Sequence, residues 1–190
     1  MFNDNMRLRE KIEKEVKPLM KEKFHYKNLM QVPRIEKIVV NVGFGRLVVE
    51  KTKEEQEKIK NEIAKILSQI TGQRPVFCLT KKAISAFKTK KGMVIGAKVT
   101  LRKQRMFDFL EKIINIVLPR LRDFKGLDEK SFDKHGNFSF GIRELIVFPE
   151  ILPEEVKFSF GLEITISLRG QKNKKEAIEF LKLINLPFKK

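Results

Sequence analysis

Residues 158–168 show the most regular hydrophobic pattern in the chain. Every second residue is apolar, namely Phe158, Phe160, Leu162, Ile164, Ile166 and Leu168. The intervening positions are small or polar, as at Glu163 and Thr165. Strict alternation is typical of a β-strand with one face against a core and the other face open. The segment therefore predicts a strand in a sheet that is covered on one side only.

The same rule assigns faces to two more predicted strands, 34–42 and 93–102. The core side receives Ile38, Val40, Val42, Ile95, Ala97, Val99 and Leu101. The open side receives Lys37, Val39, Asn41, Lys98, Thr100 and Arg102. The open face is therefore expected to carry amide, hydroxyl and cationic groups.

Helical spacing of apolar residues predicts an N-terminal helix over 6–24, kinked or divided at Pro18, and a helix over 104–118 that Pro119 ends or bends. A Thr52–Glu55 capping box begins another helix, which Gly72 ends, and a last helix begins near Asn173. Two further strands are predicted over 73–80 and 140–148, with a basic loop over 81–92 and an exposed loop over 123–139.

This order of elements predicts the α+β class. We expect a two-layer fold in which a largely antiparallel sheet has helices packed on one face and leaves its other face open. No repeat, low-complexity segment or linker divides the chain. Residues 1–190 are therefore interpreted as a single domain.

The net charge of the chain indicates which kind of partner the open face binds. The chain carries 41 Lys and Arg against 24 Asp and Glu, a formal charge of +17 with a pI near 10.0. Such an excess repels itself unless a polyanion neutralises it, and the phosphate backbone is the commonest polyanion in a cell. A genome that favours Lys is the alternative, but Lys enrichment of the thermophile kind usually brings matching Glu.

Several classes of protein are disfavoured by what the sequence lacks. Cys78 is the only cysteine, so the chain can form no internal disulfide and suits a reducing compartment. No apolar run approaches the roughly 18 residues of a membrane span, and Met1–Glu15 has no signal-peptide core. We interpret the protein as cytosolic, with a cleaved organellar leader as the open alternative.

No set of residues predicts catalysis, a cofactor or a metal. Gly43-Phe44-Gly45 follows a strand but lacks the third glycine of a dinucleotide fingerprint, and the next helix is expected only near Thr52, so a tight turn is preferred. His25 and His135 have no partner at metal-ligand spacing. Cys78 is interpreted as a small buried hydrophobe, and nothing places Glu144 and Glu150 in one cleft. The chain is therefore predicted not to be an enzyme.

Charge and pattern together favour RNA as the polyanion. Groups on the open face can donate hydrogen bonds to phosphate oxygens and ribose hydroxyls, although an ordinary solvated sheet face would look the same. That face offers no aromatic platform, so recognition of backbone and shape is expected there rather than base stacking. In the 81–92 loop, lysines flank Ile84 and Phe87, an apolar tip that is costly to expose unless a partner covers it.

These stretches resemble a known family, the bacterial-type fifth protein of the large ribosomal subunit, which binds 5S ribosomal RNA. The resemblance runs almost end to end. It is carried by MQVPR (30–34), NVG (41–43), TGQRP (71–75), the loop 82–92, GAKVTLR (96–102), PRLRDFKGL (119–127), KSFD (130–133), GNFS (136–139), FPEI (148–151) and PFKK (187–190). The loop tip departs from the family pattern with Ala83-Ile84-Ser85-Ala86-Phe87.

The resemblance implies a structural protein of the cytoplasmic ribosome that docks its sheet face on 5S rRNA in the central protuberance. Its motifs transfer 5S contacts to Asn41, Gln73 and Thr100, and the open-face cations Lys98 and Arg102 join them. The 82–92 loop would reach P-site tRNA through Lys82, Ala83, Ile84, Ser85, Phe87, Lys88, Lys90 and Lys91. It further implies contact with 23S rRNA and with neighbouring ribosomal proteins, including a small-subunit protein at an intersubunit bridge near 123–139.

Two other functions stay open from the residues alone. A free-standing RNA-binding regulator would share the charge and the open face, but it would remain in the soluble fraction when ribosomes are sedimented. An RNA-modifying enzyme would need a catalytic set or a cofactor loop, neither of which the sequence offers.

Overall fold

The computed structural model describes residues 7–122, 124–158 and 160–189. Five strands form one antiparallel sheet in the order β2-β3-β1-β5-β4. In chain order the strands are β1 (Arg34–Gly43), β2 (Val76–Leu79), β3 (Val94–Leu101), β4 (Phe138–Ile142) and β5 (Leu162–Arg169). The α+β class predicted from the sequence is confirmed.

The helices are α1 (Leu8–Lys11), α2 (Lys17–Lys23), α3 (Gly45–Val48), α4 (Lys53–Thr71), α5 (Lys103–Lys112), α6 (Leu118–Arg120) and α7 (Lys174–Leu183). Five-residue π turns, Ile12–Val16 and Ile113–Val117, join α1 to α2 and α5 to α6. Each π turn comes just before a proline, so the extra residue makes room where the ring would meet the carbonyl four residues earlier. The N-terminal helix therefore continues through Pro18 to Lys23.

The chain divides into two compact units. The first comprises Met1–Ile38, Arg102–Phe140 and Thr165–Lys190, and the second comprises Val39–Leu101 and Gly141–Ile164. Strands β1, β4 and β5 contribute residues to both. The expectation of a single domain stays a prediction.

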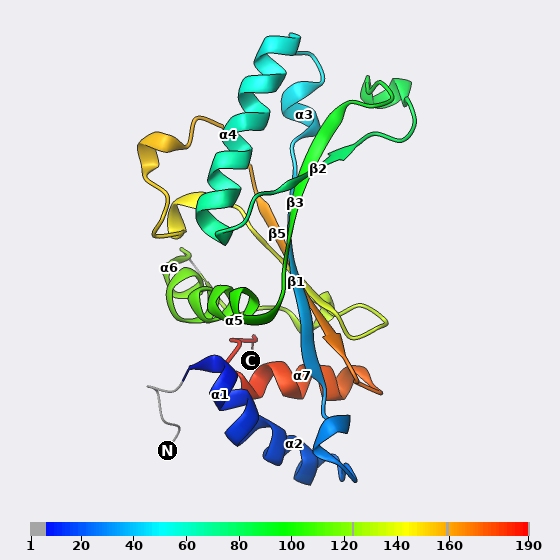
Figure 1. Ribbon diagram of the computed structural model, residues 1–190, viewed down its shortest axis with the longest axis vertical. Helices are drawn as coiled ribbons and strands as arrows, with labels where there is room; N and C mark the ends of the chain where they lie inside the picture. Colours follow the sequence, from blue (N-terminus) through cyan, green and yellow to red (C-terminus); the bar gives the residue numbers. More distant parts are fainter. Residues whose placement is uncertain (1–6, 123, 159, 190) are drawn as a thin grey trace. The chain divides into compact units, whose positions relative to one another are not determined.

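The second unit is built around the β2–β3 hairpin and α4 (Figure 1). Thr52 accepts the backbone N–H of Glu55, and the Glu55 carboxylate accepts the N–H of Thr52, which confirms the predicted capping box. Gly72 ends the helix in the left-handed conformation. The apolar stripe of α4 is buried and the helix packs beside β3. Strand β2 lies at one end of the sheet, and its Val76 and Leu79 side chains are 62% and 58% exposed.

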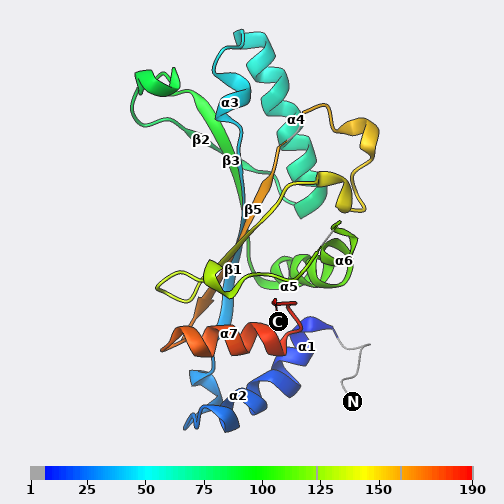
Figure 2. The same cartoon turned by 180° about the vertical axis from the view of Figure 1, so that it is seen from behind.

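The first unit gathers α1, α2, α5 and α7 around the remaining strand segments (Figure 2). Within it the 123–139 segment differs from the predicted exposed loop, although Asp123 lies outside the described residues. Leu127 and Phe132 are buried, residues Glu129–Ser131 form a 3₁₀ turn, and β4 already begins at Phe138. The C-terminal residues cover these side chains, since Leu127 N–H donates to the Pro187 carbonyl and the Phe132 and Phe188 rings stack.

Three other predicted boundaries are corrected. The strand expected over 140–148 ends at Ile142, after which Leu145–Val147 forms a 3₁₀ turn. The strand expected over 158–168 begins only at Leu162, and Ser159 lies outside the described residues. The helix expected near Thr52 is preceded by α3, which begins at Gly45 directly after β1, so the glycine pair opens a helical turn rather than a simple tight turn.

Candidate nucleic-acid interface

The open face of the second unit has the composition that the alternation predicts. Val40 and Val42 of β1 are fully buried, while Asn41 between them is half-exposed. On β3, Val99 and Leu101 are buried, Thr100 is half-exposed and Lys98 is exposed. The faces assigned to these residues from the sequence are confirmed; Ile95, expected in the core, is only half-buried.

Asn41 does not stand alone on this face. Its side-chain Nδ2 donates to Oε2 of Glu163 on the neighbouring strand β5, at 3.3 Å. The bond fixes the orientation of the amide and leaves its oxygen as an acceptor. It also places an exposed carboxylate on the candidate RNA face, so that face combines both signs of charge.

Gln73 is brought beside Thr100 by the end of α4. The left-handed Gly72 turns the chain back, and Gln73 Nε2 then donates to the main-chain carbonyl of Thr100 at 3.3 Å. Gln73 therefore lies against β3 rather than on a strand of its own. The structure thus gathers three of the residues that the family resemblance singles out into one unit: Asn41, Gln73 and Thr100.

Lys98 is the cation best placed on the open face. In the β2–β3 register it is opposite Val76, one pair before Phe77 and Ala97. Its ammonium group has no hydrogen-bond or ion-pair partner among the residues that the structure describes. An exposed, unpaired lysine can neutralise a phosphate without first breaking an internal contact.

Gly96 controls how closely β3 approaches β1. A Cβ at Gly96 would lie 2.9 Å from the main-chain oxygen of Val42, a distance that side chains do not tolerate. Cys78 is the register partner of Gly96 and is half-buried rather than fully buried as expected. The absence of a side chain at Gly96 therefore allows the close approach of β3 to the Val42 carbonyl.

Arg102 belongs to the first unit, where it is the exposed N-cap residue of α5. The same unit has a polar network on its strand segments. Ser139 and Thr165 share a 2.9 Å hydrogen bond between their hydroxyls, and Ser167 donates to Asn137. The sequence predicts Thr165 and Ser167 in the polar half of an alternating strand, and Asn137 and Ser139 in the exposed loop over 123–139.

The basic loop of residues 81–92 forms a turn that its own backbone hydrogen bonds stabilise. Ile84 and Thr89 exchange two backbone hydrogen bonds of 3.2 Å around a 3₁₀ turn at Ser85–Phe87, and Lys88 adopts the left-handed conformation. At its base the hydroxyl of Thr80 accepts the N–H of Met93. The lysines and the tip residues named in the sequence analysis are all exposed.

One lysine of the loop has an internal partner. The Lys88 ammonium group donates to Glu50, which lies between α3 and α4. This hydrogen bond and the charge of Lys88 hold the pKa of Glu50 below its ordinary value. The other loop lysines, Lys81, Lys82, Lys90 and Lys91, have no such partner among the described residues.

The segment from Asp133 to Asn137, in the first unit, forms a second turn that internal hydrogen bonds stabilise. The Asp133 carboxylate accepts the backbone N–H groups of His135 and Asn137 at 2.8 Å, and the Asn137 side chain at 2.7 Å. Burial works against this carboxylate, but the hydrogen bonds outweigh it and lower the pKa of Asp133. The turn presents Lys134 and His135 to solvent.

Metal clusters and membrane-spanning helices are absent from the described part of the chain. Across residues 7–122, 124–158 and 160–189, no three His, Cys, Asp or Glu side chains cluster in a way that could hold a metal ion. Over the same residues, none of the helices has the length and apolar character needed to cross a bilayer.

Comparisons with known proteins identify the family of this chain. The family model described as "Ribosomal protein L5" matches residues 28–90, and the model for the C-terminus of the same ribosomal protein family matches residues 94–188. The chain is 47% identical to a large ribosomal subunit protein uL5 of Pseudothermotoga lettingae over 190 residues, which is 100% of both chains. It is 48% identical to the proteins of the same name from Halothermothrix orenii, over 95% of this chain and 97% of the relative, and Thermotoga maritima, over 96% of each.

These matches cover nearly the whole chain and both compact units. They confirm the resemblance drawn from the sequence motifs. The chain belongs to the ribosomal protein L5 family, whose members are structural proteins of the large subunit of the cytoplasmic ribosome and not enzymes.

Proposed function

We propose that the protein binds 5S rRNA through the open sheet face and so helps to hold that RNA in the large subunit. In the second unit the contacts would come from Asn41, Gln73, Lys98 and Thr100. In the first unit Arg102 would make a contact of its own. The observation that carries this proposal is the unpaired Lys98 beside half-exposed amide and hydroxyl groups, on the face opposite the buried core. Such groups bind phosphate oxygens and ribose hydroxyls.

Filter binding of purified protein to 5S rRNA across a salt series tests this function. Because each neutralised phosphate releases counterions, affinity should fall steeply as salt rises. An unrelated duplex RNA of the same length serves as the control. Equal affinity for both RNAs, or affinity for 5S rRNA that is indifferent to salt, would refute specific binding.

The basic loop is proposed to contact P-site tRNA through Lys82, Lys88, Lys90 and Lys91 together with the tip residues Ala83, Ile84, Ser85 and Phe87. This proposal is supported by the hydrogen-bonded turn of the loop, which presents unpaired lysines beside an apolar tip. Ribosomes reconstituted with a Lys90→Gln, Lys91→Gln protein should hold P-site tRNA less tightly while their 5S rRNA content stays normal. Unchanged tRNA retention would remove the loop from this role.

Further partners are proposed for the rest of the molecule. The protein would contact 23S rRNA and neighbouring ribosomal proteins, including a small-subunit protein at an intersubunit bridge near 123–139. The turn at Asp133 supports this role because it is internally fixed and presents two exposed side chains, Lys134 and His135. Replacing Lys134 with Glu should weaken subunit association at low magnesium, and normal association would argue against the bridge.

A further inference from the structure

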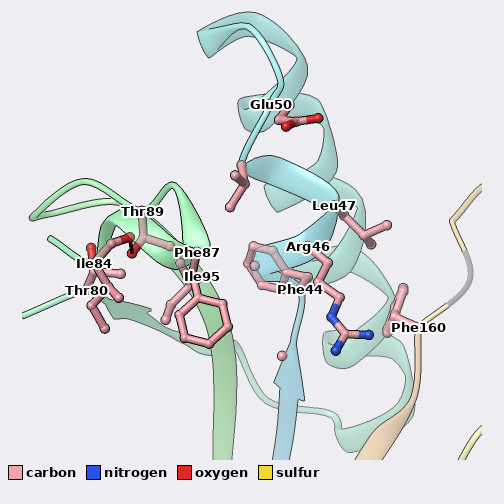
Figure 3. Close-up of a pocket in the computed structure, with 13 residues that line it drawn as sticks. Phe44, Arg46, Leu47, Glu50, Thr80, Ile84, Phe87, Thr89, Ile95 and Phe160 are labelled. Atoms are coloured by element: carbon pink, nitrogen blue, oxygen red, sulfur yellow. Dashed lines mark hydrogen bonds between the residues drawn. The ribbon is translucent and has the colours of Figure 1, made fainter.

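A cavity of about 850 Å³ lies between the basic loop and the segment that follows β1 (Figure 3). In the figure, Thr80, Ile84, Phe87 and Thr89 lie on one side and the segment from Phe44 to Glu50 on the other. All of its lining residues belong to the second unit. Its volume is within the range of roughly 300–1,000 Å³ that small-molecule sites occupy.

The walls of this cavity are apolar and partly aromatic. Ile84 is 48% exposed and Phe87 is 68% exposed, although both line it. Ile95, Leu47 and Val49 add to the apolar lining, beside the buried rings of Phe44 and Phe160. An exposed phenylalanine ring at the mouth of a cavity offers a flat surface on which another planar group can stack.

Arg46 adds one polar group to these walls. Its guanidinium has no hydrogen-bond or ion-pair partner among the residues that the structure describes. Glu50, the acidic residue of the lining, is already neutralised by Lys88. The cavity therefore combines an apolar interior with one available cation, and a guanidinium can pair with phosphate at two points or stack on a planar ring.

The surroundings decide which ligand matches this combination. Lys82, Lys90 and Lys91 stand on the same loop without internal partners among the described residues, and the whole chain carries +17. An apolar peptide could pack against the cavity walls, but it would make no ionic contact with these cations. A nucleotide uses both, because its base is planar and apolar on its faces while its phosphate is anionic.

We propose that this cavity takes a single unstacked nucleobase of RNA, with the base against Phe87 and an adjacent phosphate on Arg46. The proposal rests on the proposed function in one respect, that RNA reaches the basic loop. It goes further because it adds recognition of a base to a protein whose sheet face offers no aromatic platform. The base would supply the cover that the exposed apolar tip lacks.

The test uses the full-length protein and two probes of equal charge, a hexamer of riboadenosine and a hexamer with the same backbone but no bases. Affinity is measured by fluorescence anisotropy. Wild-type protein should bind the riboadenosine hexamer about tenfold more tightly, the scale of one stacked base. Phe87→Ala should abolish this preference, and its exposed ring makes the substitution harmless to folding.

A matched pair of charge variants isolates the cavity. Arg46→Gln and Lys91→Gln each remove one positive charge, but only Arg46 lines the cavity. Arg46→Gln should reduce the preference for the base-containing hexamer, whereas Lys91→Gln should weaken both hexamers equally. Isoleucine methyl NMR gives the location, since Ile84 and Ile95 should shift with the riboadenosine hexamer while exposed Ile146 should not.

Equal affinity of the two hexamers for wild-type protein would overturn the proposal, as would unmoved Ile84 and Ile95 methyl signals. A shift of these signals by an apolar peptide, with none by either hexamer, would assign the cavity to a protein partner instead. Binding of 5S rRNA is measured in parallel. Failure of wild-type protein to bind 5S rRNA would refute the sheet-face function without affecting the hexamer result, and normal 5S binding by Phe87→Ala would show that the two sites are separate.

Discussion

Lys98 is the residue at which the sheet-face proposal can be tested most sharply. It is exposed, unpaired among the described residues and directed to the open face by the register of β3. Lys98→Gln keeps a long polar side chain and removes the charge. We expect the variant to bind 5S rRNA more weakly and to lose less affinity as salt rises.

The magnitude follows from counterion release. One neutralised phosphate contributes about 0.9 to the slope of log affinity against log salt concentration. Between about 50 mM and about 200 mM salt, one such contact accounts for roughly a 3.5-fold loss of affinity. Wild-type protein should therefore lose roughly 3.5-fold more affinity over this range than Lys98→Gln, a difference that a filter-binding titration resolves.

Lys60→Gln is the matched control, since it changes the net charge of the protein by the same amount. Lys60 is on α4, where it pairs with Glu57 and its ammonium group lies 5.4 Å from the centre of the Phe77 ring. Lys60→Gln should keep the wild-type slope of log affinity against log salt concentration. If both variants lower the slope equally, net charge rather than the sheet face drives binding, and the reasoning about Lys98 fails.

Three further outcomes are expected. Thr100→Asp should weaken 5S rRNA binding in the same filter assay while Thr100→Ser leaves it near wild type, and equal affinities would remove Thr100 from the interface. Thr52→Ala should lower the free energy of unfolding by about 1 kcal/mol in a urea titration, because an N-terminal backbone N–H of α4 loses its cap; no change would mean that the cap is redundant. Burial and the nearby Glu176 carboxylate raise the pKa of Tyr26 above its ordinary value, so its contribution to stability is complete below about pH 10 and declines as the pH rises further. Tyr26 is the only tyrosine, and an ultraviolet titration showing ordinary tyrosinate formation in the folded protein would contradict this.

The parts of the fold that the sequence predicted are those set by local periodicity. Alternation placed Asn41 and Thr100 on the open face because side chains of a strand repeat every two residues, whatever lies around them. The start of α4 was equally local, since Thr52 and Glu55 satisfy each other within one turn. Motif resemblance was needed for Gln73, whose position depends on the left-handed Gly72 before it and on a hydrogen bond to β3.

What the sequence did not predict depends on contacts between distant segments. Leu127 and Phe132 are separated by polar residues, and Pro187 and Phe188 return from the end of the chain to contact them. The cavity likewise depends on contacts between segments that are distant in the sequence. Arg46 belongs to no recognised motif, and its place in the cavity wall becomes visible only when the loop around Phe87 lies opposite α3.

The position of β2 at one end of the sheet has a consequence for the protein before it joins the ribosome. Strand edges with exposed apolar side chains are templates for pairing with another copy, and β2 presents Val76 and Leu79 in this way. Mutual repulsion between highly charged chains opposes such pairing, but its range falls from about 8 Å at physiological salt to about 3 Å at about 1 M salt. Concentrated salt, the condition that strips RNA from a basic protein, is therefore also the condition that most favours its self-association.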